Sequence, residues 1–221
     1  ASPEKIKCKV GLATAAAVFD IGPGQENHLK INIPLDTRKS DIKLPYPVKT
    51  QQAWQENLND YCKVNLPDKH KQFLYDTAVR SVMLCSNQKE VYPGPFTYKK
   101  FWFRDATFIL YSMLCANIIP KVRTILETYP TKQKLNGYFQ SQYGEWDSNG
   151  QALWIIVQYR KFTGRDKSPR KILNTVRKGA DWIIKKCTDP HHDSPHSGLL
   201  PAGFSAEHFG PNDYYYWDDF W

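Results

Sequence analysis

The sequence predicts a mainly α-helical protein that begins with a β-hairpin. Apolar residues recur at helical spacing in several segments between residues 67 and 187. The first 35 residues instead predict two strands around a glycine-proline-glycine turn, and residues 29–35 show the alternation of a half-buried strand. Of the 221 residues, 41% are hydrophobic and 24% are charged, which is typical of a globular protein rather than a disordered one. We expect a hairpin and linker over residues 1–50 and a helical domain over residues 51–221.

The predicted hairpin pairs residues 10–21 with residues 29–35. Gly22-Pro23-Gly24 separates the two runs, and glycine and proline are the strongest turn formers. Because an isolated hairpin is marginal in water, we expect this one to belong to a larger sheet or to pack on the later part of the chain. Residues 36–66 are rich in proline, aspartate and lysine and predict a linker, with a short helix near Trp54.

The helices expected after the linker share a start signal, either a side chain that can cap the first turn or a proline at the first helical position. These signals are Asp68, Asp105, Pro120, Asp147 or Ser148, and Ser168-Pro169. Gly164 would end the fourth helix, because glycine tolerates the left-handed conformation found just past a helix end. The fifth helix would continue to Cys187. The order predicts a set of antiparallel helices.

The net charge of +8 raises the question of nucleic-acid binding. The basic residues are spread along the chain, however, and the tightest groups, at residues 69–71 and 185–186, are typical of solvated helix faces. We therefore expect no nucleic-acid partner. No apolar run approaches the roughly 18–20 residues of a membrane-spanning helix, so no membrane partner is expected either. The oligomeric state is left open.

The chain has five cysteines: Cys8, Cys62, Cys85, Cys115 and Cys187. An odd number with long gaps and no CxxC pair indicates neither a disulfide framework nor a zinc site. The last three lie in predicted helices, where a free thiol usually acts as a small buried apolar group. Unpaired cysteines favour a reducing compartment such as the cytoplasm.

A histidine-rich stretch, His191-His192-Asp193-Ser-Pro-His196, allows a metal-site interpretation, since imidazoles and a carboxylate are zinc ligands. The stretch is a proline-containing loop without the fixed helical spacing that would preorganise ligands. We favour a loop at the edge of a cleft, with no metal and no cofactor.

The last residues, 214–221, are all aromatic or acidic. So much aromatic surface would normally be buried against a following element, so we expect the chain to be part of a longer protein.

Three segments place carboxylates, arginine or amides next to tryptophan or tyrosine, at expected junctions between loops and helices. The first contains Trp102-Phe-Arg104-Asp105, the second contains Gly144-Glu-Trp146-Asp147-Ser-Asn-Gly-Gln151, and the third spans residues 196–221. This composition suits sugar binding, because a pyranose presents apolar C–H faces to a flat ring while its hydroxyls need polar partners.

Together these segments resemble the six-hairpin glycosidases, the (α/α)6-barrel superfamily of glucoamylase and related inverting glycoside hydrolases. The resemblance covers roughly residues 65–221. It implies an (α/α) toroid, or part of one, and makes the hairpin the remnant of an N-terminal β-sandwich. It also implies a glycoside hydrolase whose partner is an oligo- or polysaccharide.

The resemblance assigns sugar binding to seven residues: Trp102, Arg104, Asp105, Trp146, Asp147, Gln151 and Trp217. On this interpretation Trp146 stacks on a sugar ring, while the guanidinium, carboxylates and amide bind hydroxyl groups. The alternative is structural: Asp105 and Asp147 would cap their helices, and Arg104 would pair with a nearby acid.

The third segment should hold the general acid, which protonates the leaving oxygen and needs a raised pKa. Glu207, Asp213, Asp218 and Asp219 are the candidates, and we favour Glu207 first and Asp218 second. The resemblance places the general base on later hairpins that this chain does not include.

Two rival functions stay open. A glycoside phosphorylase would use the same fold with phosphate in place of water as the nucleophile. A carbohydrate-binding or scaffold protein would bind sugars without cleaving them, since an α/α toroid alone does not determine chemistry.

Overall fold

The computed structural model describes residues 18–28, 50–58, 61–164, 170–187, 195–204 and 212–221. The chain divides into two compact units, Ala1–Thr50 and Gln51–Trp221. In the first unit the Gly22-Pro23-Gly24 turn is present: the Gln25 amide donates to the Gly22 carbonyl at 3.0 Å, and Gly24 has a φ of 73°. The strands expected on either side fall largely outside the described residues, and residues 18–28 contain no strand.

The second unit begins with two helices that the sequence predicts. Helix α1 (Thr50–Asn57) is the short helix expected near Trp54, and α2 (Lys69–Leu84) follows the expected cap. The Asp68 carboxylate accepts from the amides of His70 and Lys71 at 2.9 and 3.1 Å. It thereby satisfies two of the amides that a helix start leaves without partners.

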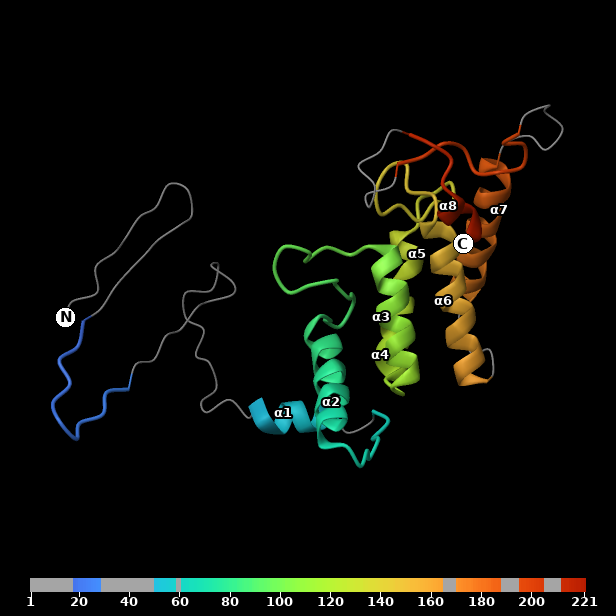
Figure 1. The fold of residues 1–221 in the computed structure, drawn as a ribbon. Coiled ribbons are helices and arrows are strands. Elements are labelled where there is room, and N and C mark those ends of the chain that lie inside the picture. The colour runs from blue at the N-terminus through green and yellow to red at the C-terminus, as the bar shows by residue number, and fades with distance from the viewer. Residues whose placement is uncertain (1–17, 29–49, 59–60, 165–169, 188–194, 205–211) are drawn as a thin grey trace. The chain divides into compact units, whose positions relative to one another are not determined.

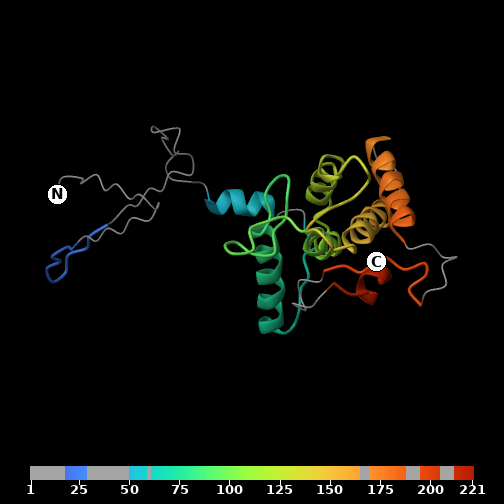
Figure 2. The ribbon, with the colours of Figure 1, turned by 90° about the horizontal axis from the view of Figure 1, so that it is seen from above.

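The rest of the unit contains two consecutive helical hairpins. Helix α3 (Phe103–Cys115) turns at Asn117, which has a φ of 61°, into α4 (Ile119–Leu126). After the single turn of α5 (Tyr129–Lys132), α6 (Ser148–Thr163) is followed by the antiparallel α7 (Arg170–Lys186). Figure 1 shows that α3 and α6 run in the same direction, and Figure 2 gives the view from above. The last short helix is α8 (Tyr216–Phe220).

The main core lies between α3 and α6, which share the most extensive helix–helix contact. Leu110 and Met113 of α3 and Ile155 of α6 are fully buried. Each such side chain contributes about 1.5–3 kcal/mol by leaving water. At the N-terminal end of α3, Phe103 packs edge-on against Phe139 at 5.0 Å between ring centroids. This packing joins the start of α3 to the loop that precedes α6.

The mainly α-helical prediction is confirmed for the described residues, which contain only two isolated β-bridges and no strand. The prediction that Asp105 caps α3 is wrong, because α3 begins at Phe103 and Asp105 lies in its first turn. The Phe103 amide donates instead to the Ser141 hydroxyl at 2.8 Å. A side chain distant in sequence has therefore replaced the local cap.

Two further expectations need correction. Cys115 is exposed rather than buried, because it lies at the end of α3, whereas Cys85 and Cys187 are half-buried. Asp147 stands at the N-cap position of α6, but its side chain makes no capping hydrogen bond. Among the described helices, none is both long enough and apolar enough to cross a membrane.

Candidate functional site

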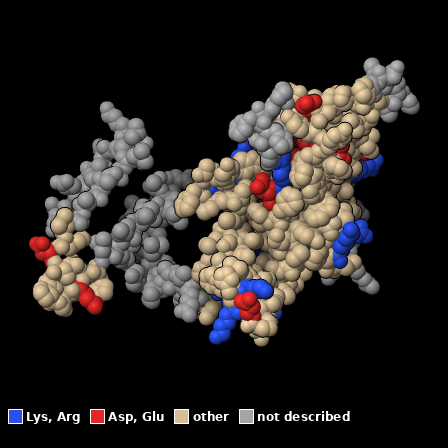
Figure 3. Space-filling view, in the orientation of Figure 1, with Lys and Arg blue, Asp and Glu red and all other residues tan. Residues whose placement is uncertain are grey.

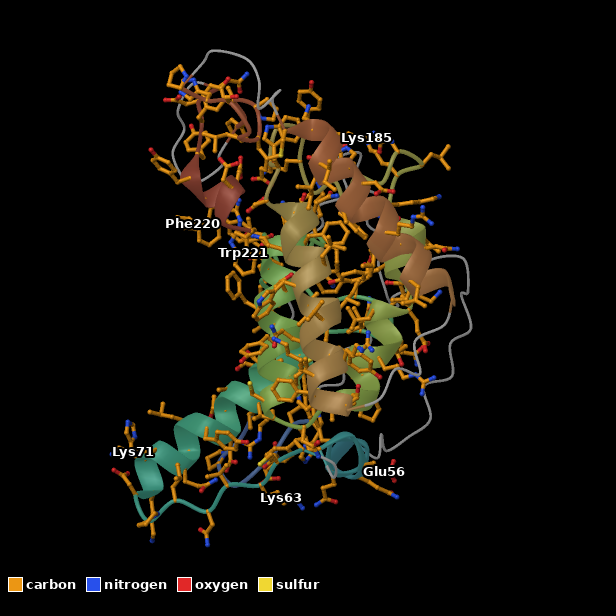
Figure 4. All side chains as sticks on the ribbon, turned by 90° about the vertical axis from the view of Figure 1, so that its right-hand side faces the viewer. Glu56, Lys63, Lys71, Lys185, Phe220 and Trp221 are labelled. Atoms are coloured by element: carbon orange, nitrogen blue, oxygen red, sulfur yellow. The ribbon has the colours of Figure 1, made fainter. Side chains whose placement is uncertain are left out.

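Side chains from all three predicted segments meet where α3 and α6 begin. Arg104 comes from the first turn of α3, Asp147 from the residue before α6, and Trp217 from α8. Figure 4 shows the labelled Trp221, at the end of α8, next to the first turns of α3 and α6. On the face in Figure 3, acidic and basic side chains lie side by side near this end of α3.

The Asp147 carboxylate is the centre of the cluster. Its Oδ2 atom accepts from Arg104 Nε at 3.0 Å, from Gln151 Nε2 at 2.8 Å and from Trp217 Nε1 at 2.6 Å. The residue is only 1% exposed. A carboxylate without water needs a counter-charge and donors, and these three groups supply both. Asp147 thus fixes the positions of Arg104 and Trp217.

A second carboxylate lies on the other side of the guanidinium. Arg104 Nη2 is 3.8 Å from Glu145 Oε1, and the same oxygen accepts from Gln142 Nε2 at 3.0 Å. Glu145 is buried. The expectation that Arg104 pairs with a nearby acid is therefore correct, twice over. Glu145 belongs to the second sequence motif, but no role was predicted for it. Its place between Gly144 and Trp146 was the only available signal.

The loop that carries Glu145 and Asp147 is fixed by a buried amide. Asn149 Oδ1 accepts from the Phe139 amide at 2.7 Å. Its Nδ2 atom donates to the carbonyls of Gly137 at 3.2 Å and Gly179 at 3.0 Å. Asn149 therefore ties the loop both to itself and to α7. Three hydrogen bonds from one side chain limit how far the two acids can move.

Asp218, the residue after Trp217, is an acid with a strongly raised pKa. It is 7% exposed, and burial raises its pKa to about 7. The neighbouring Asp147 carboxylate raises the pKa further, whereas a hydrogen bond from the Asp147 backbone and the Arg104 charge oppose the rise. Loss of water disfavours the charged carboxylate. At neutral pH Asp218 therefore holds its proton in a substantial part of the molecules.

Trp217 offers the most accessible aromatic surface in the cluster. The residue is 44% exposed although its indole nitrogen is bonded to Asp147. The Arg104 guanidinium carbon lies 5.8 Å from the centre of its ring system. An indole held at one end and exposed at the other is a suitable platform for the apolar face of a sugar.

The end of α8 approaches α6 so closely that only glycine fits there. A β-carbon at Gly150 would overlap the Trp221 carbonyl. The Trp221 ring packs edge-on against Phe108 of α3 and Trp154 of α6, at 5.8 and 5.7 Å between ring centroids. These contacts hold α8 against both helices and keep Trp217 and Asp218 next to Asp147.

Trp146 does not have the geometry expected of a sugar platform. Its ring is 6% exposed and packs against Tyr138 and Trp182, with Lys186 Nζ 4.1 Å from the ring centre. We therefore correct its role to packing. Gln151 is also fully buried and bonds Asp147, so it supports that carboxylate rather than facing a ligand.

The other predicted binding residues lie at the start of α3. Trp102 is half-buried, and its ring contacts are with Tyr98 at 6.2 Å and with the Lys100 ammonium at 5.5 Å. Asp105 is half-buried in the first turn of the helix. Both residues flank the Arg104 cluster, and neither supplies one of the hydrogen bonds that organise Asp147.

The other three candidates for the general acid lie in different places. Glu207, our first choice for the general acid, lies outside the described residues, as do His191, His192 and Asp193. Asp213 is exposed. Asp219 accepts from the Leu200 amide at 2.9 Å and so anchors the loop before α8. Within the described ranges no group of three potential metal ligands occurs.

Comparison of the chain with protein-family models, curated proteins and solved structures found no match. The case for a function therefore rests on the cluster around Asp147 and on the sequence motifs that supply it.

Proposed function

We propose that the protein is a glycoside hydrolase acting on an oligo- or polysaccharide, with Asp218 as the proton donor. The observation that carries the proposal is the place of Asp218: a carboxyl buried next to Asp147 and one residue from an exposed indole, where burial raises its pKa. A glycoside phosphorylase would use phosphate as the nucleophile, and a carbohydrate-binding or scaffold protein would cleave no bond. Both alternatives would use the same sugar site.

A proton donor in glycoside cleavage must be protonated at working pH and must deliver its proton to the leaving oxygen. An ordinary aspartate, with a pKa near 3.8, is ionised at neutral pH. Burial beside Asp147 removes this obstacle for Asp218. The same burial leaves the conjugate base poorly solvated, which favours recovery of the proton after each cycle.

Sugar binding in this proposal falls to Trp217 and Arg104. The indole would hold the C–H face of a sugar ring, and the guanidinium would donate to ring hydroxyls. Asp147 is a positioning residue, because its Oδ2 atom already accepts hydrogen bonds from both Arg104 and Trp217. This differs from the direct hydroxyl contact that the sequence motif implied.

The proposal includes a partial (α/α) toroid as the fold. Two successive helical hairpins with α3 and α6 parallel support this part of the proposal, because the resemblance implies a ring of such hairpins. The site lies where these two parallel helices begin, so neighbouring hairpins of a toroid would deliver their loops to the same end. The N-terminal turn at residues 22–25 would belong to a β-sandwich that precedes the toroid.

The test combines turnover and binding on the full 221-residue chain. A panel of α- and β-linked oligosaccharides is assayed for reducing-sugar release between pH 4 and 9, with wild type, Asp218→Asn and the exposed-residue control Asp181→Asn. Each assay is run with and without azide, an anionic nucleophile that can replace activated water, because the resemblance places the general base outside this chain. We expect kcat/KM to fall above pH 7, because a donor must be protonated, and to fall at least 100-fold in Asp218→Asn. The control should behave as wild type.

Saccharide binding is measured in parallel by calorimetry, with Trp217→Ala as the variant. Loss of the indole should weaken binding of any bound saccharide about tenfold or more. Turnover that is unchanged in Asp218→Asn would exclude this residue as the donor. Binding without turnover by wild type, even with azide present, would instead favour the non-catalytic alternative, and no binding across the panel would overturn the sugar site.

A further inference from the structure

A pocket lies beside the loop that leads into α3, away from the cluster around Asp147. It has a volume of about 460 Å³ and is lined by Glu90, Lys99, Lys100, Phe101, Lys132 and Gln140, among others. Ligand pockets for small molecules commonly have volumes of about 300–1,000 Å³, so a ligand the size of one sugar ring fits. The Asp147 cluster contributes no side chain to this lining, and the pocket has no part in the proposed hydrolysis.

The charges around this pocket do not balance. Lys132 forms an ion pair with Glu90, and the Tyr92 hydroxyl donates to the same carboxylate at 3.1 Å. The hydrogen bond from Lys132 also lowers the pKa of Glu90, which keeps it ionised at neutral pH. The single acid of the lining is therefore committed to one lysine. Lys99 and Lys100 add two positive charges without an acidic partner among the described residues.

The apolar part of the lining is rigid. The Phe101 ring is held edge-on by Phe103 at 5.0 Å and by Tyr129 at 6.1 Å between centroids. Lys132 Nζ lies 4.3 Å from the Phe101 ring centre, so the ion pair also borders the aromatic surface. The Gln140 amide also lines the pocket, and it can both donate and accept hydrogen bonds. One site thus combines a fixed aromatic ring, a neutral amide and two exposed ammonium groups.

We propose that this pocket binds a small organic anion built on a ring, such as a sugar acid or a sugar phosphate. The anionic group would be held by Lys99 and Lys100, the ring would contact Phe101, and Gln140 would bond a hydroxyl. Lysine binds carboxylates and phosphates as a point charge, and two adjacent lysines tolerate either group. A neutral sugar would leave both ammonium groups unused, and a free inorganic anion would leave the aromatic ring unused.

Calorimetric titration of the full chain with three probes tests each component. Glucuronate supplies ring and charge, glucose supplies the ring alone, and inorganic phosphate supplies charge alone. We expect glucuronate to bind at least tenfold more tightly than either of the other two, and its affinity to fall as salt rises from 50 to 500 mM because salt screens exposed charges. Equal affinity for glucuronate and glucose, or for glucuronate and phosphate, would overturn the proposal.

The matched variants change the same charge at two places. Lys99→Gln/Lys100→Gln removes the two lysines from the pocket, and Lys69→Gln/Lys71→Gln removes two exposed lysines from the start of α2. The first variant should lose glucuronate binding at least tenfold with an unchanged melting temperature, since both side chains are exposed. The second should bind as wild type. Equal losses in both variants would show a general charge effect and refute a pocket at this place.

Discussion

The raised pKa of Asp218 predicts a specific dependence of stability on pH, independent of any catalytic role. In the folded protein this carboxyl keeps its proton up to about pH 7, whereas in the unfolded chain it loses the proton near 3.8. Between these values the folded state binds more protons than the unfolded state, so the free energy of unfolding falls as pH rises through this window. About one pH unit above 7 the loss is complete.

The change Asp218→Asn isolates this effect, because asparagine has nearly the same shape and stays neutral. A shift from 3.8 to about 7 corresponds to an upper limit of about 4 kcal/mol. About 1 kcal/mol of the effect falls below pH 4.5, and local relaxation and water entry reduce such penalties in real proteins. We therefore expect the variant to gain about 1.5–3 kcal/mol relative to wild type between pH 4.5 and pH 8.5.

Urea unfolding followed by far-ultraviolet circular dichroism at six pH values gives the difference directly. Asp181→Asn, which makes the same chemical change at an exposed position of α7, controls for net charge and should show no such trend. A difference between wild type and Asp218→Asn that stays constant with pH would show that this carboxyl titrates normally. The burial argument, and with it the choice of proton donor, would then be wrong.

Three further changes test how the cluster is held together. Arg104→Met leaves the buried carboxylate of Asp147 without its cation and should lower the free energy of unfolding by about 3–5 kcal/mol in urea titrations, and a loss below about 1 kcal/mol would contradict the buried-charge argument. Asn149→Ala removes three buried hydrogen bonds and should cost about 2–4 kcal/mol, with faster amide exchange in residues 137–147 as the local readout. Gly150→Ala should displace α8, seen as faster exchange in residues 212–221, whereas Gly94→Ala, where a β-carbon meets only ordinary contacts, should leave exchange unchanged.

Local sequence signals correctly marked one end of α2, α4 and α6. Asp68 caps α2 as expected, Pro120 lies in the first turn of α4, and Gly164 ends α6 with a φ of 80°. Each of these signals acts within a few residues of the helix end that it marks. The cap predicted at Asp105 failed because Ser141, distant in sequence, bonds the first amide of α3. The five residues of α8 are too few to show a helical period.

The sequence predicted the site residues that share hydrogen bonds, but it did not predict which aromatic rings are buried by packing. The sequence motifs named Arg104, Asp147 and Trp217, and a carboxylate, a guanidinium and an indole that share hydrogen bonds do meet in space. The motif around Trp146 looked equally suitable. Its ring instead points into the interior, because Tyr138 and Trp182 provide an aromatic cluster there. No local sequence pattern indicates that Trp146 is buried whereas Trp217 faces water.

The contacts of α8 with Asp147 couple ligand binding at Trp217 to proton binding at Asp218. Trp217 donates to Asp147, and the next residue, Asp218, accepts from the backbone of that same aspartate. A ligand that binds to the Trp217 indole and moves it therefore changes the proton affinity of Asp218. Thermodynamic reciprocity requires the converse, that acidification or alkalinisation alters how firmly the ligand is held. Ligand uptake by this protein would then be accompanied by a measurable release or capture of hydrogen ions in weakly buffered solution.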